Sequence, residues 1–443
     1  METVLARFRL RENGTTAGRE ALGGLTTFLT LSYIIFVQPG VLEQAGMSFQ
    51  AVMVATCVAS ALATFLMGLA ANYPIALAPG MGENFFFVYT LCKAYGLTWQ
   101  QALAATFLAG VAFLALAGFG LRSRMVNAIP ASLKTGIAAG IGLFITLIGM
   151  EYGRLVVAHP ATLLQLGDLR HPVALTTLAG LLVTLALTGL RVRGAILLGI
   201  LASTLVAASF GMVKYTGVVS WPSGLDATLW KMDFAGLFRL PPATVVTAVF
   251  VLLFLALFDT VGTLVGVGRQ AGLLRGGELP RAERALVSDA LGTTLGAALG
   301  TSTVTCYIES AAGVSDGART GLANMVTGTL LLVAAFFTPL ARMIGGGVPV
   351  EGGVAYPTLA PALILVGGMI LRSVQDLEWD DPTEAAPAFL TMILIPFSFS
   401  IAAGVAAGFV FYAAAKVLTG RWRECPALVY VFAGLYLLHY AVK

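Results

Sequence analysis

Long apolar runs separated by short polar stretches follow one another from about residue 20 to the C-terminus. Each has roughly the 17–25 residues that a helix needs to cross a bilayer. The alternating pattern of barrel strands is absent, and only helices or closed barrels satisfy their backbone hydrogen bonds in lipid. The pattern therefore predicts membrane helices at about 20–40, 48–70, 75–92, 98–120, 127–150, 173–190, 194–213, 243–266, 284–299, 301–315, 319–341 and 357–373.

The apolar block 386–418 is too long for one crossing. Pro396 is the natural break, because proline removes a helical hydrogen bond. Splitting the block there gives about 14 helices. With a cytoplasmic N-terminus, the split also places the basic cluster Lys416, Arg421 and Arg423 on the cytoplasmic side, where basic residues are enriched.

Composition places the chain outside the soluble globular class. Of its 443 residues, 58% are hydrophobic and 11% charged, and the mean hydropathy is +0.88. The net charge of +4 comes without a long basic block, so we expect no nucleic-acid partner. Four scattered cysteines indicate neither a zinc site nor a disulfide framework, and the phosphate loop of ATPases is absent. We expect a multi-pass protein of the cell (inner) membrane with a cytoplasmic N-terminus, no metal and no cofactor.

Two acids lie inside strongly apolar spans of the second half, Glu309 in TSTVTCYIESAAG and Asp259 in LALFDTVGT. A charged side chain at mid-membrane costs at least about 2.5 kcal/mol and must face a partner, water or a substrate. Since no intramembrane Lys or Arg offers a permanent partner, both acids are functional candidates, although Asp259 could also cap a neighbouring helix. Asp289, close to Arg284, is favoured as structural, and the role of Glu83 stays open.

Two interrupted segments lie at matching positions of the two halves. The segment 78–84 (APGMGEN) and the segment 301–305 (TSTVT) each follow the start of a span, at 20 or 243, by about 60 residues. Equal offsets suggest two inverted repeats of seven helices, with the interruptions meeting near the middle of the membrane. The β-branched run Thr303–Thr305 predicts a short extended piece, which frees backbone groups for a ligand.

These segments and others resemble a known family. The matching stretches are TTFLT (26–30), YIIFV (33–37), NYP (72–74), APGMG (78–82), FDTVGT (258–263) and the run 300–321. They are similar to the adenine/guanine/hypoxanthine purine permease branch of the nucleobase:cation symporter (nucleobase-ascorbate transporter) family, over nearly the whole chain. The resemblance implies an all-α polytopic protein of about 14 helices in two inverted repeats, with short extended segments in helices 3 and 10.

The resemblance also implies a division into two domains. A core domain would comprise 16–122 and 236–343, a gate domain 123–235 and 344–420, and a C-terminal interfacial helix 421–443. The core would move against the gate in an elevator-like manner, and a homodimer through the gate domain is often formed.

Carried over residue by residue, the family's acids fall on Asp259 and Glu309 and its third-helix asparagine on Asn84. Carboxylates accept hydrogen bonds from base N–H groups, and aromatic rings stack on the base. The expected substrate-binding residues are Glu309, Asp259, Asn84, Phe258, Phe85, Ile308, Thr305 and Ser310, and the expected proton-coupling residues are Glu309, Asp259 and Glu83. The chain departs from the usual pattern at Gln38, Glu83, Phe85 and Ala256, which bears on the preferred base and on the acid that holds the proton.

The sequence thus predicts a proton-coupled symporter that imports adenine, guanine or hypoxanthine. A uracil, xanthine or small-anion carrier on the same architecture is the alternative, although two uncompensated carboxylates suit an anion poorly. A passive channel is less favoured. An enzyme is not expected, because no nucleophile and base arrangement or aspartyl-protease pattern is found.

Overall fold

The computed structural model describes residues 7–118, 129–274, 279–351 and 353–442, the last five of these as backbone only. The first half of the described chain contains α2 (Ala17–Leu31), α3 (Ile34–Glu43), α4 (Phe49–Leu66), η1 (Met67–Ala71), β1 (Leu77–Pro79), α5 (Met81–Phe85), η2 (Phe86–Ala94), α6 (Trp99–Gly118), α8 (Ala131–Tyr152), β2 (Val156–His159), β3 (Leu163–Leu166), α9 (Pro172–Gly189) and α10 (Ala195–Ser209).

The second half contains η3 (Leu225–Ala227), α11 (Phe234–Leu237), α12 (Pro242–Gln270), α13 (Ala282–Leu299), β4 (Val304–Cys306), α14 (Ser310–Ser315), α15 (Leu322–Ala334), η4 (Ala335–Phe337), α16 (Thr338–Gly345), β5 (Val348–Val350), β6 (Gly353–Ala355), α17 (Ala360–Leu371), η5 (Arg372–Asp376), α18 (Pro382–Ser398), α19 (Ile401–Leu418), η6 (Trp422–Glu424) and α20 (Ala427–Val442). Within the described ranges, eight helical stretches are long and apolar enough to cross a membrane.

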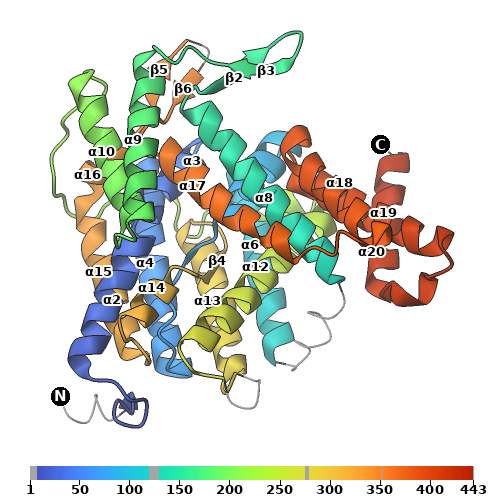
Figure 1. The fold of residues 1–443 in the computed structure, drawn as a ribbon, viewed down its shortest axis with the longest axis horizontal. Helices are drawn as coiled ribbons and strands as arrows, with labels where there is room; N and C mark the ends of the chain where they lie inside the picture. Colours follow the sequence, from blue (N-terminus) through green and yellow to red (C-terminus); the bar gives the residue numbers. More distant parts are fainter. Residues whose placement is uncertain (1–6, 119–128, 275–278, 352, 443) are drawn as a thin grey trace.

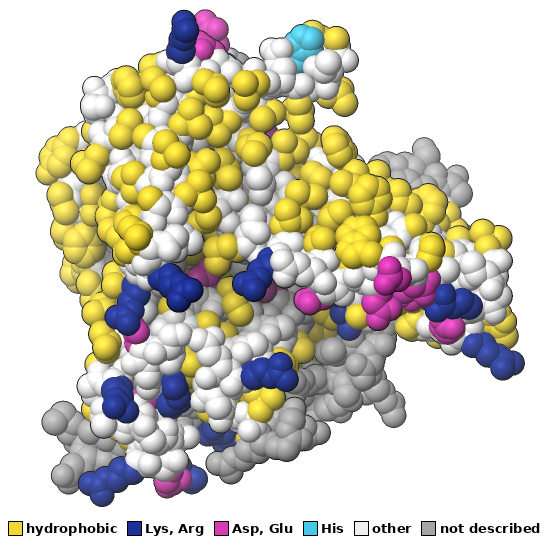
Figure 2. All heavy atoms as spheres, in the orientation of Figure 1, with side chains coloured by type: hydrophobic (Ala, Val, Ile, Leu, Met, Phe, Trp, Pro, Cys, Tyr) yellow, Lys and Arg dark blue, Asp and Glu magenta, His cyan; other side chains and the backbone are white. Residues whose placement is uncertain are grey.

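The exterior matches a lipid-facing protein. In Figure 2, hydrophobic side chains cover the upper part of the visible face, and Lys and Arg side chains gather below it. Large apolar residues such as Leu182, Leu185 and Leu205 are exposed on α9 and α10. A soluble protein rarely exposes so much contiguous apolar surface, whereas a bilayer covers it.

The helices pack as two groups that meet across the middle of the molecule (Figure 1). In one group, α15 packs on α2 and α4, and α13 packs on α6 and α4. In the other, α8 packs on α17 and α18, α18 packs on α19, and α9 packs on α10. Glycines allow close approach: a Cβ added at Gly136 of α8 would lie 2.6 Å from the Ala388 carbonyl oxygen of α18.

The two interrupted segments form a short antiparallel ladder inside the first group. Ala78 pairs with Thr305 and Pro79 with Val304. The ladder is extended by hydrogen bonds from Gly80 N to the Thr303 carbonyl (3.0 Å) and from Tyr307 N to the Ala76 carbonyl (2.9 Å). The extended piece predicted around residues 303–305 is thus observed as β4. Because each strand runs directly into a short helix, α5 or α14, the start of both helices lies at one place.

The apolar block 386–418 is divided into two helices, as predicted, but the break lies later than Pro396. That proline stays inside α18, and the chain turns at Phe399, whose φ of +50° is left-handed. Ser400 then begins α19 by accepting the N–H of Ala403 at 3.2 Å. The left-handed residue Phe399 thus ends α18 and the serine cap begins α19, whereas α18 continues through Pro396 despite the missing hydrogen bond.

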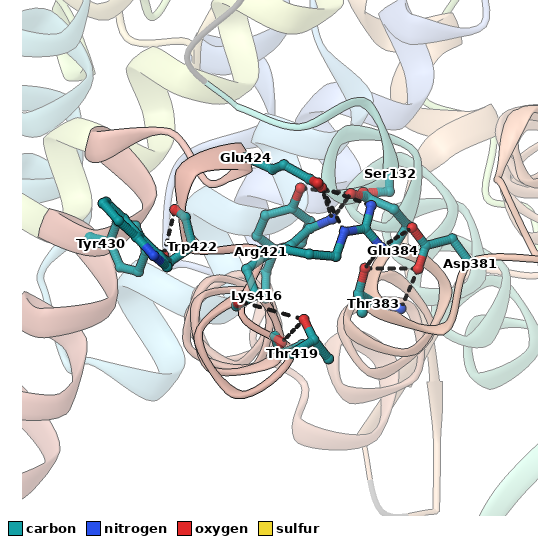
Figure 3. Close-up of polar contacts among 12 residues, drawn as sticks. Ser132, Asp381, Thr383, Glu384, Lys416, Thr419, Arg421, Trp422, Glu424 and Tyr430 are labelled. Carbon is teal, nitrogen blue, oxygen red and sulfur yellow. Dashed lines mark hydrogen bonds and ion pairs between the residues drawn. The ribbon is translucent and has the colours of Figure 1, made fainter.

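An ion-pair network with a buried lysine at its centre joins the beginning of α18 to the end of α19 (Figure 3). The ammonium of Lys416, which is fully buried, lies 2.7 Å from Glu384 and 3.0 Å from Glu424. Arg421 contacts Asp381 at 2.7 Å and Glu424 at 2.7 Å. The network therefore fixes the connection that leads into α20, which packs against α19.

Candidate functional site

A cavity of about 530 Å³ opens where the two groups of helices meet. One wall comes from α5, α12 and the segment between β4 and α14, and the other comes from α8 and α17. The volume lies within the range of small-molecule sites, roughly 300–1,000 Å³. Most of the wall is apolar, with the acids Glu83, Asp259 and Glu309 among the lining residues.

Glu309 sits at the N-terminal cap of α14, directly after the extended segment. Its Oε1 accepts a hydrogen bond of 2.6 Å from the hydroxyl of Tyr33. The Thr30 hydroxyl lies 3.3 Å from the backbone carbonyl of Glu309, but its single proton has nearer acceptors in the carbonyls of Thr26 and Thr27, both at 2.9 Å. Tyr33 lies between α2 and α3, where the backbone keeps right-handed helical angles, and its side chain lines the cavity. Tyr33 thus fixes the carboxyl group of Glu309.

Asp259 projects from the middle of α12 into the open cavity. Its Oδ2 accepts a 2.9 Å hydrogen bond from Thr305 of β4. A carboxylate has two oxygens and about four acceptor positions, so both Asp259 and Glu309 keep acceptor capacity for a ligand. In each case a protein hydroxyl occupies one oxygen and fixes the orientation of the group.

Glu83 lies in the first turn of α5 and is 2% exposed. Its Oε1 has no hydrogen-bond partner in the part of the chain that the structure describes. Asp259 is near enough to act on it electrostatically. The carboxyl group folds back over Gly80, where an added Cβ would clash with it and lie 3.0 Å from the Thr305 hydroxyl. Glycine at position 80 therefore makes room for this acid beside the ladder.

The other predicted site residues divide into two sets. Phe258 and Ile308 line the cavity, together with Glu309, Asp259 and Glu83. Thr305 does not line it but holds Asp259 from behind. The hydroxyl of Ser310 accepts the N–H of Ala76 at 3.0 Å, which ties α14 to the segment before β1.

Asn84 and Phe85 also lie behind the cavity wall. Asn84 Oδ1 accepts the hydroxyl of Ser302, which in turn accepts from Gln38 Nε2 at 2.9 Å. The ring of Phe85 packs on Tyr89, with centroids 6.0 Å apart. In this conformation the side chains of Asn84 and Phe85 contact other protein residues, and these contacts stabilise the two interrupted segments.

Asp289, interpreted from the sequence as structural, is fully buried on α13. Neither of its carboxyl oxygens has a hydrogen-bond partner among the described residues, and it does not pair with Arg284. Its neighbours are Thr260 and Cys306, and Cys306 forms part of the cavity wall. Asp289 therefore contacts a residue of the cavity wall, Cys306, but does not itself line the cavity.

Tyr33 and Lys134 are among the polar lining residues that were not predicted as site residues. Tyr33 was part of a matching motif, but nothing in the sequence shows that its hydroxyl reaches Glu309. Lys134 lies in the first turn of α8, and its Nζ stands 4.8 Å from the centroid of the Phe258 ring. Because Lys134 lies near the end of a predicted helix, the sequence did not indicate that it lines the cavity. Among the described residues, no group of three or more His, Cys, Asp or Glu side chains could hold a metal ion.

A multi-pass helical fold with two interrupted segments beside an acid-lined cavity defines a membrane carrier. The chain belongs to the Permease family (Xan_ur_permease), whose model matches residues 18–411. This confirms the resemblance found in the sequence, and with the apolar helices it identifies a multi-pass membrane protein.

Individual relatives cover almost the whole chain. The adenine permease AdeP of Escherichia coli is 42% identical, over 97% of this chain and 94% of its own length. The guanine/hypoxanthine permease PbuO of Bacillus subtilis is 39% identical, over 97% of this chain and 99% of its own. Among solved structures, the transmembrane domain of the cyanobacterial bicarbonate transporter BicA is similar with a TM-score of 0.65, covering 87% of this chain and 97% of that domain. At 16% identity, that similarity concerns the fold alone.

Proposed function

We propose that this protein is a proton-coupled symporter that imports the purine nucleobases adenine, guanine and hypoxanthine. The observation that carries the proposal is the orientation of Glu309 and Asp259 toward one cavity of about 530 Å³, each with one oxygen held by a hydroxyl. The names of the relatives, adenine permease and guanine/hypoxanthine permease, support the same class of substrate.

The chemistry of a purine suits this cavity. A purine is flat, apolar on its faces, and carries N–H donors on its edges. The free acceptor positions of Glu309 and Asp259 would receive these donors, because hydrogen bonds to a carboxylate are stronger than those between neutral groups. Phe258, with Ile308 beside the opening, would contact the faces of the base.

The acids also provide for proton coupling. Moving a net negative charge through the membrane interior costs a large free energy of desolvation. Binding of a proton neutralises the charge and removes this cost. Glu309, Asp259 and Glu83 line one cavity, so the binding of a base and of a proton would influence one another. Coupling follows if the domain crosses only when both are bound or both are absent.

For the movement we propose an elevator. In this proposal the chain would form 14 helices in two inverted repeats, with a core (16–122 and 236–343) and a gate (123–235 and 344–420) on the two sides of the cavity. The core would carry the acids, while α8 and α17 of the gate supply the opposite wall. The N-terminus would be cytoplasmic, and the gate would support a homodimer.

Uptake into proteoliposomes tests the proposal. Radiolabelled adenine, guanine, hypoxanthine, xanthine and uracil are compared with and without an inward proton gradient. We expect saturable uptake of one or more purines that the gradient accelerates. If the folded protein takes up none of these bases, the proposed substrate class is wrong. If uptake is saturable but its rate does not change with the proton gradient, the proposed proton coupling is wrong. Uptake that does not saturate would indicate a channel.

A further inference from the structure

Two tyrosines stand side by side in the cavity wall, and their hydroxyl groups have different partners. The rings of Tyr33 and Tyr307 are 6.4 Å apart, and both side chains are less than 5% exposed. The hydroxyl of Tyr307 donates to the backbone carbonyl of Pro79 at 2.6 Å. The hydroxyl of Tyr33 donates to Glu309 Oε1, also at 2.6 Å. One phenol therefore secures the ladder, and the other acts on the acid.

We propose that Tyr33 is a positioning residue that determines which carboxylate oxygen of Glu309 receives the base. The inference rests on the proposed function, since it concerns how the same site binds its purine. With Oε1 taken by the phenol, Oε2 is the oxygen available to an N–H of the ligand. A carboxylate rotates readily about its last bond, so a fixed donor on one oxygen gives the other a defined direction.

The location of Tyr33 supports this role. It lies between α2 and α3, and its phenol reaches the carboxyl group of Glu309 at the start of α14. A tyrosine that served packing alone would not need this contact, because a phenylalanine ring would fill nearly the same buried space without the hydroxyl.

A double-mutant cycle tests whether Tyr33 acts through Glu309. The variants are Tyr33→Phe, Glu309→Asp and the double variant, and the dissociation constant for hypoxanthine is measured by calorimetry or ligand-dependent thermal shift. Glu309→Asp keeps the charge but withdraws the carboxylate by one methylene, away from the phenol. Tyr412→Phe, alone and with Glu309→Asp, is the matched control, because it deletes a buried phenol hydroxyl that donates to a different glutamate, Glu384, at 2.8 Å and does not line the cavity.

We expect Tyr33→Phe to weaken hypoxanthine binding about tenfold in the wild-type background, as for loss of a hydrogen bond to a charged group. In the Glu309→Asp background the same change should weaken binding no more than about twofold. Tyr412→Phe should have the same effect in both backgrounds. Equal factors for Tyr33→Phe in both backgrounds, or no effect in either, would overturn the proposal.

The wild type and the variants of both cycles, without ligand, give a second measurement that does not depend on transport. Their midpoints of thermal unfolding should be non-additive for Tyr33 with Glu309 and additive for Tyr412 with Glu309. Additive midpoints for both pairs would also overturn the role of Tyr33. If the wild type binds no base while the Tyr33 midpoints remain coupled, the proposed function fails and the contact itself stands.

Discussion

The buried ammonium of Lys416 offers a quantitative test of what holds the α18–α19 pair together. The substitution Lys416→Met keeps most of the side-chain volume and removes the charge. In the structure this side chain is fully buried and contacts Glu384 at 2.7 Å and Glu424 at 3.0 Å (Figure 3). Without it, Glu384 keeps only hydroxyl donors, from Ser132 and from Tyr412 at 2.8 Å.

The magnitude follows from the burial of the two partners. Removing one member of a buried ion pair costs about 3–5 kcal/mol, because the remaining charge loses its compensation. Glu384 is 16% exposed and has the two hydroxyl donors, so we expect the low end, about 3 kcal/mol. Glu424 is 50% exposed, so Glu424→Gln should lower the stability much less than Lys416→Met, because solvent screens an exposed pair.

Thermal unfolding of the purified protein in detergent measures these differences. Lys416→Met should lower the midpoint by roughly 5–10 °C. The double variant Lys416→Met with Glu384→Gln should recover part of the loss, since it leaves no uncompensated carboxylate. Arg9→Gln, which removes an exposed pair at 3.6 Å with Glu12, is the control and should change the midpoint by less than about 2 °C. A midpoint for Lys416→Met equal to that of Arg9→Gln would refute the reasoning.

Three further predictions concern other contacts. Hydrogen bonds from Thr383, and to a smaller extent from Arg421, lower the pKa of Asp381 to about 2. The ionised Asp381 carboxylate therefore contributes fully to the stability of the fold above about pH 4, and this contribution is lost as the pH falls toward 2. The unfolding midpoint of the wild type should therefore exceed that of Asp381→Asn at pH 7, with a difference that shrinks below pH 4; a difference that grows on acidification would contradict the assignment. Arg193 pairs with Asp316 across the proposed gate and core, so Arg193→Gln should raise the maximal uptake rate up to about fivefold and leave purine affinity within about twofold. An unchanged rate would show that the pair is not broken during transport. A Cβ at Gly68 would lie 2.7 Å from the Gly321 carbonyl oxygen, so Gly68→Ala should destabilise by about 1–3 kcal/mol, whereas Gly18→Ala, in open space on α2, should not; equal midpoints would disprove the close packing.

Hydropathy and residue chemistry predicted much of this architecture. The apolar spans, the division of the block 386–418 and the extended piece around Thr305 were visible in the sequence, because bilayer thickness and backbone hydrogen bonding restrict the possible structures. Glu309 and Asp259 stood out because acids are costly inside apolar spans. The comparisons confirm the family.

Other features depend on contacts between distant segments and could not be read from local patterns. No local pattern around Tyr33 indicates its partner, and only the tertiary structure shows its phenol beside Glu309, 276 residues further along the chain. Asn84 carries a polar side chain in an interrupted segment, yet its partner is Ser302 rather than the cavity. The helix end at Phe399 depends on a left-handed residue that is neither Gly nor Asn, so it lacks the usual sequence signal.

The role of the cavity is tested by gradient-driven purine uptake into proteoliposomes, in which the wild type is compared with Glu309→Gln and Asp259→Asn, with Glu12→Gln as the control. We expect Glu12→Gln to transport normally and both cavity variants to lose uptake by about tenfold or more, since each loses a charge-assisted contact with the base. Full gradient-driven uptake by Glu309→Gln and Asp259→Asn would contradict the assignment of this cavity as the binding site.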